Sequence, residues 1–254
     1  MGTYAEAYTA DSSLKGKLRR RLVRLVSRRR LATAPAKPMV SFTFDDAPLT
    51  SAVAGAALLE TRGLAGTYYV SAGLAGAQAP MGVCADPIDY QRLARAGHEI
   101  ACHTYSHLDC GQASGAAALA DVTRNAEAVA SWNVGPMVSF AYPYGDVAGA
   151  TKGALASRFS TLRALHHGLV EQGTDLNQVP AVGIEGPEGE TVARTWLARA
   201  KASSAWLILY THDVRPAPSP WGWTPEVLAR LLDQAVADGF EVVTVREGAR
   251  RLGI

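Results

Sequence analysis

The chain has 254 residues, of which 48% are hydrophobic and 19% charged, and its formal net charge is +2. This composition excludes a wholly disordered or fibrous protein, and the length suits one large α/β domain. The near-neutral charge conceals an asymmetry, because residues 1–30 carry nine Lys/Arg against two acidic residues, whereas the remaining chain carries sixteen basic and twenty-one acidic residues. The sequence therefore predicts a basic arm in front of a mildly acidic body.

The first predicted element is a basic amphipathic helix that ends near Leu31. Its leucines, Leu14, Leu18, Leu22 and Leu25, recur at helical spacing, and Lys/Arg fill most positions between them. Adhesion to an anionic membrane surface suits this pattern, and so does packing of the leucine face on the body or on a second subunit. No nucleic-acid partner is expected, because the segment lacks aromatic residues. We assign residues 1–38 to this arm and a proline-containing linker, and residues 39–254 to the main domain.

From Met39 onward, short β-branched or aromatic runs alternate with alanine-rich helical stretches, the pattern of repeated β/α units. The predicted strands are 40–44, 67–70, 99–102, 137–141, 161–165, 179–184, 206–210 and 241–245. The predicted helices are 51–62, 87–96, 116–132, 190–201 and 225–238. Seven or eight strands in this alternation predict an irregular (β/α) barrel, in which chemistry is expected just past the carboxyl-terminal ends of the strands.

The cysteine content and the amino-terminal sequence bear on location. Cys84, Cys102 and Cys110 are too few for a disulfide scaffold, which favours a reducing compartment. The basic cluster comes late and is not followed by an apolar run with small cleavage-site residues, so no secretory signal is predicted. We therefore expect a cytoplasmic protein, with the arm as a peripheral contact at the inner face of the membrane.

Ionisable residues follow two of the predicted strands directly. Asp45 and Asp46 end the first strand and point in different directions, so that one can bind a metal while the other acts as a base. His103 and His107 follow the third strand, and their spacing places both imidazoles on one face if the segment forms a helical turn. Two histidines and one aspartate leave a coordination position open, as in a catalytic zinc site.

Two further strand ends carry candidate residues. His212 follows the strand at 206–210, with the adjacent Asp213 as an alternative, purely structural partner. Tyr142 and Tyr144 lie in a Pro/Gly turn after the strand at 137–141, where a tight turn can expose backbone N–H groups. The joint occurrence of such residues at four strand ends is far less probable by chance than their occurrence at any one of them.

With these residues, the chain from about residue 39 to 253 resembles a polysaccharide deacetylase of the NodB-type carbohydrate esterase family. The matching motifs are Thr43-Phe-Asp-Asp46, His103-Thr-Tyr-Ser-His107, Tyr142-Pro-Tyr-Gly145 and Leu209-Tyr-Thr-His212. The first two motifs are highly specific, whereas the last two support the resemblance by position. The resemblance implies an irregular (β/α) barrel and metal-dependent removal of acetyl groups from N-acetylated amino sugars.

The resemblance also implies a role for each matching residue. The implied ligands of a divalent metal, most simply Zn²⁺, are Asp46, His103 and His107. Asp45 would be the general base that takes a proton from the attacking water, and His212 the general acid that protonates the leaving amine. The backbone N–H of Tyr144 would stabilise the tetrahedral oxyanion together with the metal.

Two positions depart from the family pattern. Many members carry an arginine two residues before the proline of the third motif, where it orients the catalytic aspartate, and this chain has Ala141 there. Arg163 on the following strand is the candidate replacement. The family's fourth motif, Asp-x-x-x-Trp, has no clear counterpart, and Asp175 is the candidate substitute.

The candidate substrate-binding residues are Trp221, Trp223, Tyr142 and Arg163. The two tryptophans either form an apolar platform for a sugar ring or pack their proline-rich loop onto the barrel. His166 and His167 follow the fifth strand, so that one of them can reach the rim.

Three functions fit these observations. The leading hypothesis is a deacetylase of N-acetylated amino sugars in an exopolysaccharide, such as a holdfast-type adhesin, or in its lipid-linked precursor. A catalytically degenerate barrel that binds glycan is the second, because Ala141 and the missing fourth motif weaken the family pattern. The third is a metal-dependent hydrolase of small amides, since the barrel and the metal ligands do not determine substrate size. A homo-oligomer is compatible with all three.

Overall fold

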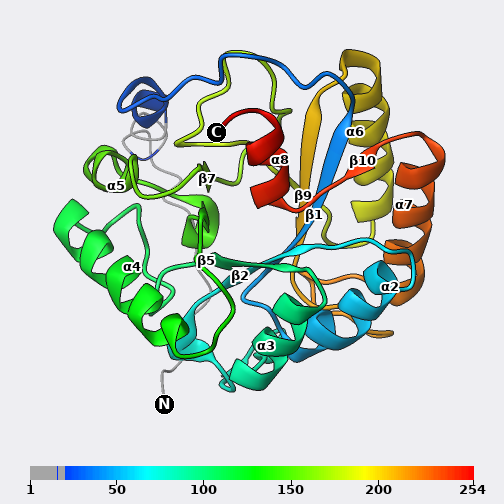
Figure 1. The fold of residues 1–254 in the computed structure, drawn as a ribbon, viewed down its shortest axis with the longest axis horizontal. Coiled ribbons are helices and arrows are strands. Elements are labelled where there is room, and N and C mark those ends of the chain that lie inside the picture. Colours follow the sequence, from blue (N-terminus) through cyan, green and yellow to red (C-terminus); the bar gives the residue numbers. More distant parts are fainter. Residues whose placement is uncertain (1–15, 17–20) are drawn as a thin grey trace.

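A curled sheet of parallel strands lies at the centre of the structure, a computed structural model that describes residue 16 and residues 21–254 (Figure 1). Its strands are β1 (Met39–Asp45), β2 (Thr67–Val70), β5 (Glu99–Cys102), β6 (Ser139–Ala141), β7 (Thr161–Arg163), β8 (Val182–Gly183), β9 (Trp206–Thr211) and β10 (Glu241–Val242). They are ordered β7-β6-β5-β2-β1-β9-β8, and β10 pairs with the first residues of β1. This arrangement confirms the predicted irregular (β/α) barrel.

The segment before β8 bridges the two ends of this sheet. The Val179 N–H donates to the Leu162 carbonyl at 2.8 Å, and the Val179 carbonyl accepts from the Ala164 N–H at 2.9 Å, which ties Val179 to β7. Three residues later, Val182 pairs with Leu209 of β9. The predicted strand at 179–184 is therefore divided between two neighbours, and in doing so it closes the barrel.

Helices surround the outside of the sheet (Figure 1). They are α2 (Ala56–Glu60), which continues the π-helical turn η2 (Ser51–Gly55), α3 (Pro87–Arg95), α4 (Gly115–Ala130), α5 (Gly149–Leu155), α6 (Gly189–Ser203), α7 (Pro225–Ala237) and α8 (Val245–Arg251). Shorter elements are the 3₁₀ turns η1 (Val23–Leu25), η3 (Ala72–Leu74) and η4 (Pro143–Gly145), and the hairpin of β3 (Gln78–Ala79) and β4 (Gly82–Val83). None of the helices within the described part of the chain is long and apolar enough to cross a membrane.

Two helices were not predicted, α5 and α8. The predicted strand at 241–245 ends at Val242, because the Thr244 hydroxyl accepts a hydrogen bond from the Glu247 N–H at 3.2 Å and so caps α8. Trp206 packs against Gly248 of this helix, where an added Cβ would lie 2.7 Å from the indole ring. A glycine is needed there because α8 approaches the start of β9 so closely.

The alternation of side chains along β1 separates the core from the site. All seven residues of the strand are buried. Phe42 and Phe44 belong to the main hydrophobic cluster, to which α2, α6 and α7 contribute. Thr43, between them, points to the other face, inside the barrel, where its hydroxyl donates to the Leu209 carbonyl at 2.9 Å. Asp45 continues this inward row to the strand's carboxyl end.

The described part of the arm lies against the barrel. Val23 and Leu31 are buried in two different hydrophobic clusters. The Leu31 N–H donates to the Thr174 carbonyl at 2.8 Å, and the Arg29 guanidinium donates to the Phe159 carbonyl at 2.8 Å.

The helix predicted to end near Leu31 ends at Leu25, because the following residues extend along the barrel and pair at Arg30 with Asp175. Residues 14, 15 and 17–20 of the predicted helix lie outside the described residues. The division of the chain at residue 38 stays a prediction.

Candidate active site

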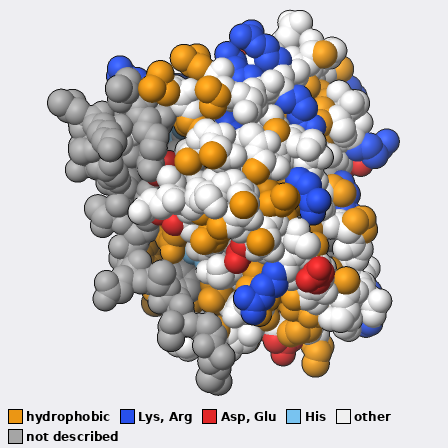
Figure 2. Space-filling view, turned by 90° about the vertical axis from the view of Figure 1, so that its left-hand side faces the viewer, with side chains coloured by type: hydrophobic (Ala, Val, Ile, Leu, Met, Phe, Trp, Pro, Cys, Tyr) orange, Lys and Arg blue, Asp and Glu red, His pale blue; other side chains and the backbone are white. Residues whose placement is uncertain are grey.

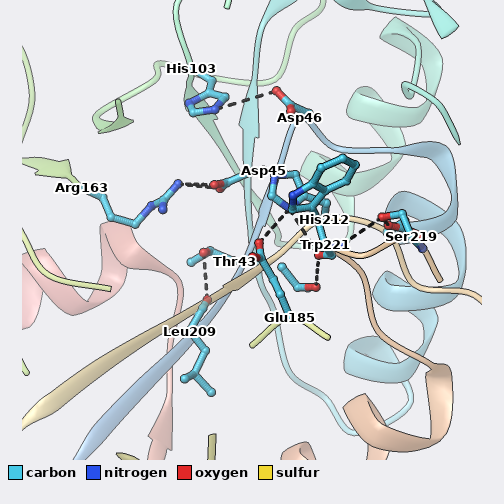
Figure 3. A network of polar contacts seen from close by, with 12 residues as sticks. Thr43, Asp45, Asp46, His103, Arg163, Glu185, Leu209, His212, Ser219 and Trp221 are labelled. Carbon is cyan, nitrogen blue, oxygen red and sulfur yellow. Dashed lines mark hydrogen bonds and ion pairs between the residues drawn. The ribbon is translucent and has the colours of Figure 1, made fainter. Parts of the chain in front are cut away.

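Charged side chains from the ends of several strands meet in one cluster inside the barrel mouth (Figure 3). These are Asp45 at the end of β1, Asp46 directly after it, His103 directly after β5, Arg163 from β7, Glu185 from the segment after β8, and His212 directly after β9. These residues lie at or just after strand ends, where the sequence analysis expected the chemistry.

The backbone of this cluster is conformationally unusual. Of the eight non-glycine residues with positive φ in the described chain, five lie at its rim: Asp46, Ala47, Thr104, His107 and Tyr144. Such conformations cost about 1–3 kcal/mol each and persist only where the surroundings impose them, which happens most often at functional sites. The two strand-end loops after β1 and β5 and the turn η4 thus hold side chains in positions that relaxed turns would not provide.

A candidate metal centre consists of Asp46, His103 and His107. One ligand atom from each lies within 4.8 Å of the other two, and all three residues are buried. The Asp46 Oδ1 lies 3.3 Å from the His107 Nε2 and 3.9 Å from the His103 Nε2. The structure therefore brings together the three ligands that the sequence predicted.

The protonation of His103 suits a metal ligand. Its Nδ1 lies 2.8 Å from the Ala141 carbonyl, which can only accept, so Nδ1 carries the proton and Nε2 presents its lone pair toward Asp46. Burial, followed by the neighbouring His107, lowers the pKa of His103 to about 4. A neutral imidazole at neutral pH, a second imidazole and a carboxylate fit a divalent first-row cation such as Zn²⁺.

The loop that carries both histidines is not the helical turn that their spacing suggested. Asp121 of α4 accepts hydrogen bonds from the backbone N–H groups of Tyr105 and Ser106, at 2.7 and 3.0 Å. The backbone at Thr104 and at His107 is left-handed, which turns the second imidazole back toward the first. The sequence carried no signal for Asp121, because its role depends on how α4 packs beside this loop.

Asp45 is held by Arg163. One guanidinium nitrogen lies 2.6 and 2.7 Å from the two carboxylate oxygens, and the guanidinium carbon lies 4.8 Å from the ring centroid of Tyr69 (Figure 3). Arg163 is paired with Ala141 across β6 and β7. The predicted contact is confirmed. Many family members carry the arginine at the position of Ala141, whereas here it stands at the paired position on the neighbouring strand. Only 1% of the Arg163 surface is exposed, so the structure gives it a contact with Asp45 and no open surface for the predicted contact with substrate.

His212 contacts a carboxylate that sequence analysis missed. Its Nδ1 lies 3.4 Å from Glu185 Oε1 and 3.3 Å from the Trp221 carbonyl (Figure 3). Burial by itself lowers the pKa of His212, but Glu185 and, through space, Asp45 and Asp46 outweigh it and raise the pKa to about 9. The histidine is therefore a cation at neutral pH. Glu185 comes directly after the predicted strand at 179–184, so the strand-end rule applied to that strand would have found it.

Asp175, the predicted substitute for the family's fourth motif, has another role. Its Oδ2 lies 2.6 Å from the Lys152 Nζ, and its Oδ1 accepts from the Arg29 N–H at 3.0 Å. This carboxylate attaches the arm to the barrel, and no contact with His212 is seen. The prediction for Asp175 is wrong because it lies between the arm and α5, away from the barrel mouth.

The loop after β9 is fastened to the strand end by its own side chains. Asp213 turns away from His212 and accepts hydrogen bonds from the Ser219 N–H, at 2.9 Å, and from the Ser219 hydroxyl. This fold returns the Trp221 carbonyl to the strand, where it accepts from the His212 N–H at 3.1 Å. Asp213 is thus a structural residue of the loop rather than the partner of the imidazole.

The structure corrects two candidate substrate residues. Trp223 is buried in the main hydrophobic cluster, where it packs the proline-rich loop onto the barrel. Tyr142 is buried, and its hydroxyl donates to the Asn177 carbonyl at 3.1 Å. Trp221 stays partly exposed, and Tyr144 is partly exposed with its ring perpendicular to that of His107 at 4.5 Å between centroids. The contacts of these two residues with a substrate, and the oxyanion role of the Tyr144 N–H, stay predictions.

Comparison with known proteins identifies the class. The model of the polysaccharide deacetylase family matches residues 32–158, half of the chain, and the protein belongs to this family. A comparison with curated proteins finds no match. The family defines the protein as a polysaccharide deacetylase.

Solved structures share the fold over most of the chain. A putative polysaccharide deacetylase from Mycobacterium smegmatis is 20% identical, with a TM-score of 0.69 over 89% of this chain and 95% of that one. The chitin deacetylase from Colletotrichum lindemuthianum is 21% identical, with a TM-score of 0.60 over 87% and 91%. A family 4 acetyl xylan esterase from Clostridium thermocellum, in complex with cobalt, is 20% identical, with a TM-score of 0.53 over 82% and 89%. At these identities the likeness concerns the fold.

Proposed function

We propose that this deacetylase hydrolyses the N-acetyl amide of amino-sugar residues in an exopolysaccharide, or in its lipid-linked precursor, with a divalent metal that is zinc in the simplest case. One observation supports this most directly: a three-ligand metal site lies beside a braced carboxylate, Asp45, and a cationic imidazole, His212. An amide is a poor electrophile with a poor leaving group, and its hydrolysis needs all three components.

The chain's own residues divide the remaining work. A divalent cation held by Asp46, His103 and His107 supplies a Lewis acid that polarises the acetyl carbonyl and lowers the pKa of water. Asp45 accepts the proton of the attacking water, and Arg163 keeps its carboxylate in one orientation. Orientation matters because a general base contributes about 10²–10⁴-fold only when it lies within hydrogen-bonding reach of the proton it takes.

His212 supplies the proton that the departing amine requires. The Glu185 contact raises the pKa of His212, which favours the protonated imidazole, and the Glu185 and Trp221 contacts at Nδ1 leave Nε2 as the donor toward the substrate. A protonated imidazole next to a carboxylate held by an arginine matches the two proton transfers of amide hydrolysis.

The same contacts argue against a barrel that binds glycan without turnover. That alternative was motivated by Ala141 and by the missing fourth motif. Arg163 contacts Asp45 and Glu185 contacts His212, so both catalytic residues have a charged partner despite these departures. We therefore favour catalysis, and we further propose a cytoplasmic location, which the three free, buried cysteines support.

Acetate release from chitooligosaccharides and from an N-acetylated lipid-linked oligosaccharide tests the proposal. With zinc added, we expect turnover by the unmodified chain and a loss of about 10²–10⁴-fold in Asp45→Asn, the range for a positioned base. Asp233→Asn, at an exposed aspartate on α7 outside the catalytic cluster, is the control and keeps full activity. Equal rates for Asp45→Asn and the unmodified chain contradict the proposal, and preferential cleavage of small linear amides in competition favours a different substrate class.

A further inference from the structure

A cluster of exposed apolar side chains lies on the arm, away from the catalytic residues. Leu22, Leu25 and Val26 are 53%, 68% and 44% exposed, whereas Val23 between them is buried. Arg21, Arg24 and Arg28 are exposed on the same short segment. This segment is the dark-blue coil at the upper left of Figure 1, and Figure 2 shows hydrophobic and basic side chains intermingled on that side of the molecule.

The segment presents these leucines from a fastened backbone. The Val23 carbonyl accepts from the buried Lys152 Nζ at 2.9 Å, and the Ser27 carbonyl accepts from the Asn177 Nδ2 at 2.7 Å. Val23 already packs into the barrel, so the chain has an inward side and uses it. Because both ends of the segment are tied down, Leu22 and Leu25 are directed into solvent by the fold itself.

A positively charged pocket separates this segment from the barrel. It has a volume of about 260 Å³ and is lined by Arg24, Arg28, His166, Asp175 and Gln178, among others. Of the described residues, Asp175 is the one carboxylate in the lining, and its Oδ2 lies 2.6 Å from the Lys152 Nζ, which offsets its charge. The two guanidinium groups therefore determine the sign of the pocket. Burial, followed by Arg24 and Lys152, lowers the pKa of His166 to about 4, which agrees with a positive potential.

We propose that Arg21–Arg28 docks the enzyme on an anionic phospholipid bilayer, with Leu22, Leu25 and Val26 entering the acyl boundary and a lipid phosphate bound between Arg24 and Arg28. Charge complementarity supports this occupant, because planar guanidinium groups recognise phosphate in a bidentate manner. Apolar residues beside them distinguish a bilayer from a soluble anion, since stable peripheral binding combines buried apolar area with electrostatic attraction. The basic residues that precede Arg21 in the sequence have the same sign.

The loop after β7 connects this surface with the catalytic cluster. Leu165 packs against Gly145 of the turn η4, so closely that an added Cβ on Gly145 would lie 2.2 Å from the Leu165 Cγ. The next residue, His166, lines the phosphate pocket. The pocket residue His166 is therefore the chain neighbour of Leu165, which contacts the third motif at Gly145. If the proposed lipid-linked substrate is correct, the same docking also brings the enzyme to the surface that carries this substrate.

Co-sedimentation of the full chain with vesicles tests the docking surface. We compare phosphatidylcholine vesicles with phosphatidylcholine vesicles containing phosphatidylglycerol, and expect binding only to the latter. The variants Leu22→Ser/Leu25→Ser and Arg24→Gln/Arg28→Gln each reduce the partition coefficient at least tenfold. The matched control, Ile88→Ser/Arg95→Gln, changes an exposed apolar and an exposed basic residue on α3 and binds like the unmodified chain.

Each alternative occupant has a distinct outcome that overturns the proposal. Equal binding to both kinds of vesicle contradicts the role of lipid charge, and unchanged binding by Arg24→Gln/Arg28→Gln contradicts the phosphate pocket. If glycerol 3-phosphate binds in the absence of vesicles and the leucine variant binds vesicles normally, the pocket serves a soluble anion. If the leucine variant instead changes the mass measured by light scattering, the segment contacts a second copy of the chain. Acetate release from soluble chitooligosaccharides is expected to be the same in all variants, which separates a failure of docking from a failure of the proposed function.

Discussion

The catalytic cluster and the arm are both rich in charge, but they use it in opposite ways. At the barrel mouth, Arg163 and Asp45 are almost fully buried and in direct contact. On the arm, Arg21, Arg24 and Arg28 are exposed. Buried charges interact strongly over short distances and depend on exact partners, whereas exposed charges act through a field that salt screens over about 8 Å at physiological ionic strength. The near-neutral net charge of the chain conceals this difference, because it is the sum of a basic arm and a mildly acidic remainder.

The largest expected effect concerns the buried pair. Arg163→Met leaves Asp45 without its partner, and we expect the free energy of unfolding to fall by about 3–5 kcal/mol, the usual result of orphaning one member of a buried ion pair. Urea denaturation measures this loss. Because Ala141 is paired with Arg163 across two strands, the double variant Ala141→Arg/Arg163→Ala restores part of the stability and of the activity. No recovery in the double variant would show that the two strand positions are not equivalent for orienting Asp45.

Metal removal has the next largest effect. Because the three ligands come from β1 and the loop after β5, a bound cation joins two elements that are distant in sequence. We expect zinc at a hundred times its dissociation constant to add about 2.7 kcal/mol to the free energy of unfolding. Calorimetry with and without a chelator measures the change, and His107→Ala abolishes the zinc-dependent part. A melting temperature that does not respond to zinc would argue against this site.

A smaller effect concerns His212 in the metal-free protein. Its folded-state pKa is raised to about 9, so the charged form predominates below that pH and is lost as the pH rises through it. Glu185→Gln removes the carboxylate that contacts His212 and raises its pKa, and we expect the imidazole to titrate at a lower pH. NMR titration of the histidine ring protons measures the shift. The matched control, Glu188→Gln, changes an exposed glutamate nearby and leaves the titration unchanged.

The smallest effect at the catalytic cluster is expected from salt, and it distinguishes the two charge systems directly. Raising the salt from 0.1 to 1 M shortens the screening length from about 10 to 3 Å. We expect vesicle binding through the arm to weaken strongly over this range, while acetate release from soluble substrate changes little, because the Arg163 and Asp45 contact is buried. If vesicle binding and acetate release fall together, exposed charge also governs the catalytic cluster.

Several features of the site were accessible from the sequence because they follow from local rules. Apolar runs that end in Asp45-Asp46 and in His103 predict that strand ends deliver these side chains to one rim, and a parallel sheet has no alternative to doing so. Glu185 obeys the same rule, since it directly follows the predicted strand at 179–184, although the observed strand β8 is only Val182–Gly183. The cap of α7 is equally local, since the Thr224 hydroxyl accepts from the Val227 N–H at 3.3 Å.

Other features required the tertiary structure. The convergence of His103 and His107 depends on Asp121, which lies fourteen residues beyond His107 and reaches the loop only because α4 packs beside it. The spacing alone suggested a helical turn, because local periodicity cannot represent a left-handed backbone imposed from outside.

The sequence by itself predicted the alternation of strands and helices, apart from α5 and α8, and the three candidate metal ligands, because both predictions rest on patterns within a few residues. Only the tertiary structure decided that Arg163 takes over from Ala141, that Glu185 rather than Asp175 accompanies His212, and that the arm lies on the barrel with its leucines exposed. These outcomes depend on strand register and on contacts between segments far apart in the chain. Side-chain partners across such distances are selected by the packing of whole elements, which no local pattern encodes.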